Sequence, residues 1–110
     1  REELEEFANN LMEYGLSLSE VADNCPKQER TLQACHKALQ AARENPGILD
    51  RFVKSRRLPL AELTAVSGVA RKTLERHRSY MMAILLAYTN GYEIIRGHLC
   101  QVSGGKEASV

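Results

Sequence analysis

Residues 58–80 are the part of this sequence that most limits what the chain can fold into. Four apolar residues around Gly68 have the spacing with which two crossed helices bury a shared face. They are Leu63, Val66, Val69 and Leu74. Glycine readily adopts the left-handed backbone that a sharp turn requires. The stretch therefore predicts a helix-turn-helix, with a first helix from Leu60 and a second that begins near Arg71.

The second helix of this motif would carry cations on its outer face. If the apolar residues pack against the first helix, Arg71, Lys72, Glu75, Arg76 and Ser79 are left facing outward. A recognition helix contacts base edges with its N-terminal turns, so these cations stand where a reader of the DNA major groove needs them. The pattern predicts a domain that binds duplex DNA.

The candidate DNA-contacting residues lie on this helix and just before the motif. They are Arg71, Lys72, Thr73, Glu75, Arg76, Arg78, Ser79, Arg56 and Arg57. Arg76 is our first choice for base readout, because arginine presents a bidentate fork to guanine that is worth roughly 1–3 kcal/mol of discrimination. Glu75 would either accept a hydrogen bond from cytosine or pair with Arg71 or Arg78 at helical spacing, and we favour the pairing.

Two other sets of candidates have alternative roles. Thr73 would bond a phosphate, meet a thymine methyl or simply serve the first helical turns. Arg56 and Arg57 would clamp phosphates without reading sequence, or would complement the dipole of a helix end. His77 lies on the same stripe as Leu74 and Met81, so we expect a partly buried structural histidine and not a catalytic group or a pH switch.

The remaining segments also predict helices, and no strand is predicted. Apolar residues recur at helical spacing over residues 2–14, 17–25, 26–44, 48–57 and 92–101. Ser17 and Glu20 have the spacing of a capping box, and Pro26 would stand in the first turn of its helix. Inward-facing residues would include Leu4, Phe7, Leu11, Cys35 or His36, Leu39, Ile48, Phe52 and Val53.

The second motif helix is predicted to continue for about twenty residues, to a stop at Asn90 and Gly91. Its first half is cationic, whereas residues 81–87 are apolar on all sides and belong in the core. The predicted fold class is therefore all-α: a compact multi-helix domain over residues 1–101. Its helix-turn-helix spans about 59–90 and has a long second helix as the recognition helix. Residues 102–110 predict a disordered tail.

Charge is distributed unevenly along a chain whose net charge is +1. Between Arg51 and Arg78 there are eight basic residues and two acidic ones, whereas residues 1–50 carry ten acids and five bases. A basic face on a nearly neutral domain attracts a phosphate backbone, while the acidic part points away or meets another partner.

Several function classes are not expected. Cys25, Cys35 and Cys100 form no C-x-x-C pair, which indicates reduced thiols without a metal or cofactor, and no set of residues suggests an enzyme. The longest apolar run, residues 80–88, is too short to cross a membrane, and no signal peptide is evident, so we expect a cytoplasmic protein. Residue 1 is not methionine and already lies in a helical pattern, which indicates a piece of a larger protein.

Residues 71–80 carry a resemblance to a known family, together with residues 58–63 before them and 81–92 after them. In these segments the chain resembles the C-terminal domain of bacterial sigma factors of the sigma-I type. A weaker likeness through residues 11–26 extends the resemblance over most of residues 1–99. The chain has Asn90-Gly91-Tyr92 where that family tends to have Gly-Asp-Tyr, a departure at the end of the helix and not on its reading face.

The resemblance implies a promoter-recognition module. In that family the C-terminal domain binds the −35 element of double-stranded promoter DNA, and a separate N-terminal domain contacts core RNA polymerase and the −10 region. The DNA-facing residues implied here are Arg71, Lys72, Thr73, Arg76 and Arg78. The resemblance also implies regulation by a membrane-anchored anti-sigma factor of the RsgI type, through its cytoplasmic N-terminal domain. The alternative is a helical protein-interaction domain that mainly docks such a partner, chiefly through residues 1–45.

Overall fold

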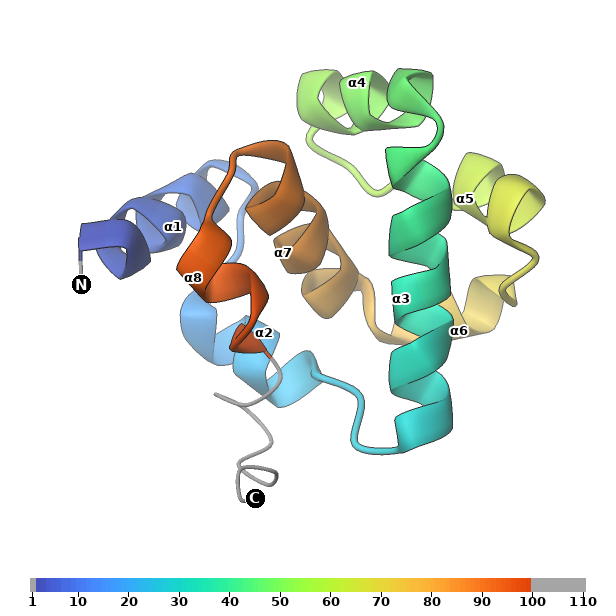
Figure 1. Ribbon diagram of the computed structural model, residues 1–110, viewed down its shortest axis with the longest axis horizontal. Helices are drawn as coiled ribbons and strands as arrows, with labels where there is room; N and C mark the ends of the chain where they lie inside the picture. The colour runs from blue at the N-terminus through green and yellow to red at the C-terminus, as the bar shows by residue number, and fades with distance from the viewer. Residues whose placement is uncertain (1, 100–110) are drawn as a thin grey trace.

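The computed structural model describes residues 2–99 of the chain, and this part is all-helical, as predicted (Figure 1). Its helices are α1 (Glu2–Glu13), α2 (Leu18–Asn24), α3 (Glu29–Arg43), α4 (Pro46–Ser55), α5 (Leu60–Ser67), α6 (Arg71–Arg76), α7 (Arg78–Thr89) and α8 (Glu93–Arg96). Residues 102–110, the predicted tail, lie outside the described residues.

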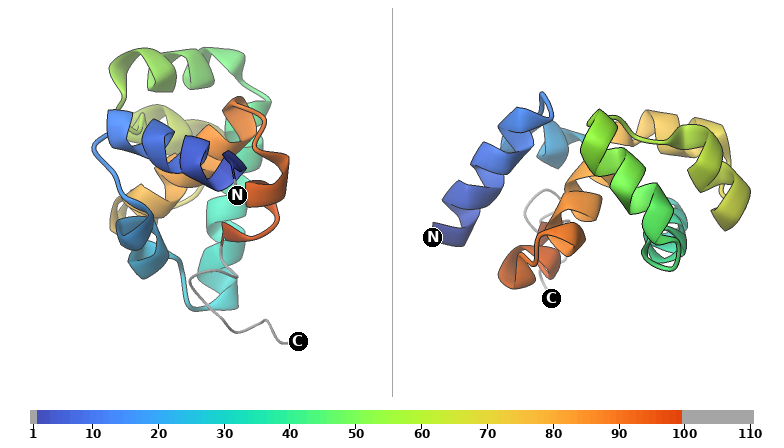
Figure 2. Two further views of the ribbon diagram at one scale, coloured as in Figure 1. Left: turned by 90° about the vertical axis from the view of Figure 1, so that its left-hand side faces the viewer. Right: turned by 90° about the horizontal axis from the view of Figure 1, so that it is seen from above.

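Helix α7 forms the centre of the fold. All its residues from Tyr80 to Ala87 are buried, which confirms that the apolar run of the sequence belongs in the core. Helices α1, α2, α3 and α8 all pack against α7 (Figures 1 and 2). Helix α3 contacts α7, α4, α5 and α6, so it connects the core to the helix-turn-helix.

The connection between α1 and α2 forms as its residues predict. Gly15 takes a left-handed backbone with φ of 75° directly after α1. The Ser17 hydroxyl accepts the Glu20 N–H at 3.1 Å, and the Ser17 N–H donates to the Glu20 carboxylate at 3.0 Å. These reciprocal bonds satisfy backbone groups that the start of α2 would otherwise leave without partners, and they confirm the capping box.

Most predicted core positions are buried, and three are not. Phe7, Leu11, Cys35, Leu39, Ile48 and Phe52 are buried, whereas Leu4, Val53 and Val66 are 46%, 42% and 43% exposed. His36, the alternative to Cys35, is exposed. In α5 the buried residues are Leu63 and Ser67, four positions apart, so Val66 between them is turned toward solvent. The prediction assumed that the buried stripe runs from Leu63 to Val66, at i, i+3, whereas in the structure it runs from Leu63 to Ser67, at i, i+4.

Several helix boundaries differ from the prediction. Helix α3 begins at Glu29 and not at Pro26, because Gln28, its N-cap, still has an extended backbone. Pro26 is buried in the connection from α2. The predicted long recognition helix is divided at His77, whose φ of −110° and ψ of 38° separate α6 from α7. Helix α7 ends before Asn90 and Gly91, as predicted, but α8 is shorter than expected.

Two chemical expectations can be compared with the described residues. Cys35 carries a free, buried thiol, and burial raises its pKa to about 11. Cys25 is disulfide-bonded, so the expectation of reduced thiols is wrong for this residue. Within residues 2–99 no helix has the length and apolar character needed to cross a membrane.

Candidate nucleic-acid interface

Helices α5 and α6 meet across the sharp turn that the sequence predicts. Gly68 ends α5 in the left-handed conformation, with φ of 76°, and Leu63, Val69 and Leu74 are buried around it. The buried Ser67 adds two hydrogen bonds. Its hydroxyl donates to the Leu63 carbonyl at 2.6 Å and accepts the Val69 N–H at 3.1 Å. The turn is therefore fixed by backbone conformation, apolar burial and a satisfied polar side chain.

The helix-turn-helix is supported from behind by α3 and α4. Small residues, Cys35, Ala38 and Ala42, are fully buried on α3, which packs closely against α5 and also contacts α6. An ion pair between the Arg51 guanidinium and the Glu62 carboxylate, at 2.9 Å, joins α4 to α5. These contacts hold the two helices against the body of the molecule and leave the outer face of α6 open.

The outer face of α6 centres on Lys72 and Arg76. These residues lie one turn apart and opposite the buried Leu74, and both are exposed. Among the described residues, neither side chain makes a hydrogen bond or an ion pair. Their charges are thus available to an anionic ligand.

Arg71 and Glu75 flank this face and bind each other. The Arg71 Nε lies 3.1 Å from a Glu75 carboxylate oxygen, at i, i+4 spacing. The structure therefore shows the pairing that the sequence favoured for Glu75. Both side chains are about half exposed, at 56% and 49%, so this is a surface ion pair of small worth that a phosphate can replace.

The other residues predicted to contact DNA are less favourably placed than Lys72 and Arg76 on the outer face of α6. Thr73 is half-buried on α6, and Arg78 and Ser79 lie beyond the break, in the first turn of α7. The Arg78 guanidinium lies 3.4 Å from the sulfur of Met82. The predicted site is therefore continuous along residues 71–79 but bends at His77.

Arg56 and Arg57 stand apart from α6, at the end of α4. Arg56 is the C-cap of α4 in a left-handed conformation, with φ of 58°. Its guanidinium lies 5.8 Å from the ring centroid of Tyr14, whose pKa is raised by burial. Arg57 is exposed in the connection to α5. The structure does not bring these two residues onto the outer face of α6.

The break between α6 and α7 is held by Asn24, a residue that the sequence reasoning missed. The Asn24 amide donates to the Arg76 carbonyl at 2.8 Å, and its side-chain oxygen accepts the Tyr80 N–H at 2.9 Å. The backbone carbonyl of Asn24 also lies 2.7 Å from Nδ1 of His77. One residue of α2 therefore satisfies the end of α6, the start of α7 and the histidine between them.

His77 has the structural role that the sequence predicts, since it is half-buried and bonded to Asn24. Nothing in the sequence pattern announces its partner. Asn24 closes a short helix next to Cys25 and Pro26, more than fifty positions away along the chain. Local spacing carries no signal for a contact of this range.

Ion pairs within residues 51–78 neutralise the acids of this basic segment. Its two acids, Glu62 and Glu75, are each paired with an arginine. The cations of α6 that remain are not balanced by a neighbouring carboxylate, so the potential around them is positive. Among residues 2–99 no group of His, Cys, Asp and Glu is arranged to hold a metal ion. The arrangement is suited to contact with an anionic polymer.

Comparison with known proteins gives consistent relatives. The chain is 30% identical to RNA polymerase sigma factor SigI7 of Acetivibrio thermocellus and 31% identical to RNA polymerase sigma factor SigI of Bacillus subtilis, in each case over 90% of its length. It spans 42% and 39% of these relatives, which is less than half of each. No protein-family model and no solved structure matches the chain. These homologues support the assignment of the chain as a C-terminal region of the SigI type of RNA polymerase sigma factors.

Proposed function

We propose that this chain recognises the −35 element of double-stranded promoter DNA, as the C-terminal part of a SigI-type sigma factor in transcription initiation. The observation that carries the proposal is the outer face of α6, where Lys72 and Arg76 are exposed and unpaired on a helix that follows a tight turn. Helix α6 is anchored at both ends, by the turn at Gly68 and by Asn24. A rigid helix with a free cationic face is what major-groove recognition needs.

The short length of α6 is compatible with this function. Six residues span about 9 Å, and a recognition helix reads bases mainly with its N-terminal turns. In the proposed complex Arg76 presents its fork to a guanine, and Lys72 neutralises a phosphate. Arg71 exchanges its surface pair with Glu75 for a second phosphate. Thr73, Arg78 and Ser79 supply further contacts to the backbone.

A single motif of this kind is expected to bind DNA weakly by itself. It has one short reading helix and neither a second half-site nor polymerase contacts to add to it. We propose that core RNA polymerase is engaged by the longer protein, in the bacterial cytoplasm. Regulation by an RsgI-type anti-sigma factor is implied by the sequence resemblance alone and stays a prediction.

Fluorescence anisotropy over a series of salt concentrations tests the proposal. The probes are a labelled duplex with a promoter −35 element and a scrambled duplex of the same composition. Lys72→Ala is expected to weaken binding to both duplexes alike and to lower the salt slope by about one, because one phosphate contact is lost. Lys54→Ala is the matched control, since it removes a lysine from the exposed surface of α4.

Two results would overturn the proposal. The first is that neither duplex binds at low salt. The second is that Lys72→Ala and Lys54→Ala have equal effects, which would mean that binding follows total charge and not α6. The rival function, docking of a regulatory partner, predicts a different pattern. Lys72→Ala and Arg76→Ala would leave partner binding intact unless the partner covers α6.

A further inference from the structure

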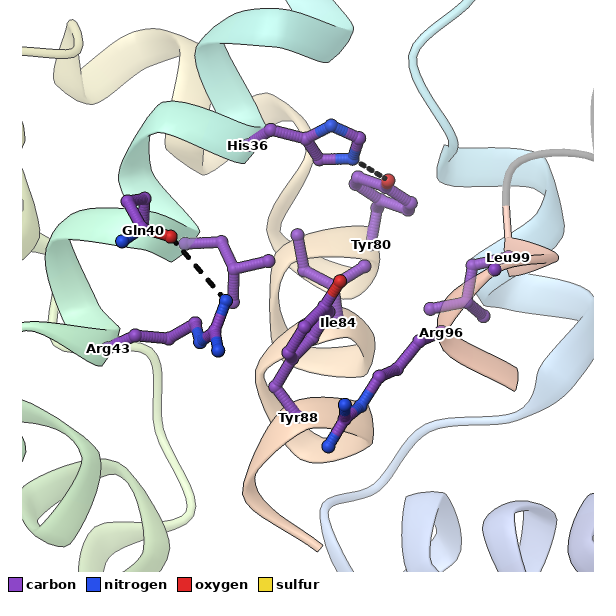
Figure 3. A pocket seen from close by; sticks show the side chains of 10 residues that line it. His36, Gln40, Arg43, Tyr80, Ile84, Tyr88, Arg96 and Leu99 are labelled. Carbon is purple, nitrogen blue, oxygen red and sulfur yellow. Dashed lines mark hydrogen bonds between the residues drawn. The ribbon is translucent and has the colours of Figure 1, made fainter. Parts of the chain in front are cut away.

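A pocket of about 380 Å³ lies between α3, α7 and α8 (Figure 3), and none of its lining residues belongs to α5 or α6. Pockets of this size are large enough to hold several side chains of a ligand. Seen from above, α6 and α8 lie on opposite sides of the central α7 (Figure 2). A ligand in this pocket would therefore leave the face of α6 free.

Two arginines converge on one tyrosine ring in the pocket. The guanidinium of Arg43, from α3, lies 4.8 Å from the ring centroid of Tyr88, and that of Arg96, from α8, lies 4.6 Å from it. They approach the ring from different sides (Figure 3). No aspartate or glutamate is among the lining residues. Two like charges thus flank one aromatic ring, which offsets only part of their repulsion.

Both arginines keep unused hydrogen-bonding capacity. The Nε of Arg96 is buried and has no hydrogen-bond partner among the described residues. The only side-chain bond of Arg43 there is a long one, from its Nη1 to the Gln40 side-chain oxygen at 3.5 Å. A buried donor without a partner is unfavourable, and a carboxylate is the acceptor that best fits the planar arginine fork.

The rest of the pocket is neutral. Its walls include Leu39, Ile84 and Leu99, and Nε2 of His36 is hydrogen-bonded to the Tyr80 hydroxyl at 3.0 Å. His36 is exposed as a whole residue, but partial burial of its ring lowers its pKa, so it adds no third cation at neutral pH. A ligand that fits would carry a carboxylate for the arginines and an apolar group for the walls.

We propose that this pocket binds an acidic segment of a partner protein, with carboxylates bound by Arg43 and Arg96 on their own sides of the Tyr88 ring and a neighbouring apolar side chain against Ile84 and Leu99. Duplex DNA is a poorer occupant, because the pocket opens away from α6 and offers apolar walls that a phosphate backbone does not fill. The proposal does not depend on the function proposed for α6. The two surfaces are separate, so one can fail while the other stands.

Selection from a random peptide library displayed on phage tests this proposal with the 110-residue chain as bait. The Arg43→Gln/Arg96→Gln double variant serves as the counter-selection. The enriched peptides are synthesised, and their affinity is measured by fluorescence anisotropy. We expect enriched peptides with Asp or Glu next to an apolar residue. Each single Arg→Gln variant should bind them about tenfold more weakly, the loss of one charge-assisted hydrogen bond.

Matched controls separate a specific site from general charge and from misfolding. Arg30→Gln removes the same charge from an exposed position on α3, outside the pocket, and should leave the affinity unchanged. Arg96→Lys keeps the charge but loses the planar fork, so its affinity should be intermediate. Circular dichroism must show that each variant keeps the helical content of the wild-type chain.

Several outcomes would overturn the proposal. They are a selection that enriches no peptide, equal binding of the enriched peptides to the double variant, and equal binding after their acids are replaced by Gln. Displacement of the peptide by duplex DNA would also overturn it, since the pocket would then belong to the nucleic-acid surface. Absence of DNA binding by the same chain at low salt would refute the function proposed for α6 without affecting this result.

Discussion

The contact that most clearly governs the candidate interface is the bridge from Asn24 to the break at His77, and replacing Asn24 tests it. Asn24→Ala removes the hydrogen bond to the Arg76 carbonyl and the one from the Tyr80 N–H. The Tyr80 N–H is in the first turn of α7, where His77, the N-cap, provides no side-chain cap. Asn24 therefore caps α7 from another helix.

The expected cost follows from these two bonds. A hydrogen bond of this kind contributes about 1 kcal/mol, and loss of an N-cap costs a similar amount. Tyr80 is 1% exposed, so water cannot easily replace the lost acceptor. We expect Asn24→Ala to lower the free energy of unfolding by about 2–3 kcal/mol. Asn24→Asp keeps the acceptor for Tyr80 but places a carboxylate oxygen against the Arg76 carbonyl, and it should lose about half as much.

Urea unfolding at pH 7, followed by circular dichroism, measures these differences. Asn9→Ala is the control, because Asn9 is an exposed asparagine of α1 with no side-chain hydrogen bond among the described residues. At a temperature where all variants are folded, Asn24→Ala should also narrow the difference in affinity between the −35 duplex and the scrambled duplex. A loss below about 0.5 kcal/mol, the usual size for surface changes, would refute the reasoning. So would an unchanged preference between the two duplexes.

Three further predictions concern the turn, the surface pair and the pocket histidine. Gly68→Ala should lower the free energy of unfolding by about 1–2 kcal/mol in urea melts, because an alanine at this positive φ is strained even though its Cβ meets open space. Gly47→Ala is the control: its Cβ also meets open space, but Gly47 has no positive φ, so this change should not lower the stability of the chain. Glu75→Gln should change stability by less than about 1 kcal/mol while it strengthens DNA binding, because it frees Arg71; weaker DNA binding would instead assign Glu75 to base contact. Burial lowers the pKa of His36 in the folded chain, so its protonation favours unfolding, and wild-type stability should fall as the pH drops below the ordinary value of 6.5. In urea melts at a series of pH values, His36→Gln should reduce the loss of stability below pH 6.5. An unchanged dependence of stability on pH would contradict the assignment of this loss to His36.

The sharp turn between α5 and α6 was predictable because its signals are local. The turn at Gly68, the capping box at Ser17 and the apolar run of residues 81–87 each act within a few turns of chain, and the structure confirms all three. The preferred role of Glu75, pairing with Arg71 or Arg78, was also correct, and the structure shows Arg71 as the partner. Neighbours at i, i+4 on a helix pair without tertiary information.

The errors share a different cause. The predicted single helix from Arg71 to Asn90 has no breaker in its sequence, and it is divided at His77, where Asn24 takes over the hydrogen bonds of both helix ends. Val66 was placed inward by spacing alone, but the direction in which α3 approaches α5 decides which stripe is buried. Both are effects of long-range packing on a local pattern that was itself read correctly.

The arginine pocket lies beyond sequence reasoning for a similar reason. Arg43 and Arg96 are far apart in the chain, and each resembles a solvated cation at a helix end. Only the packing of both α3 and α8 against α7 brings the two arginines to Tyr88. A local pattern can predict where a helix carries charge, but not which two charges will meet.

The most direct test of the central claim is to select preferred duplexes from a randomised DNA pool, at low salt, with the wild-type chain and with Arg76→Ala in parallel. Arg76 is exposed on the outer face of α6, one turn after Lys72, so it should specify one base pair. We expect the wild-type chain to enrich a sequence motif and Arg76→Ala to lose the preference at a single guanine position. The same motif from both proteins, or no motif from the wild-type chain, would contradict recognition of DNA by α6.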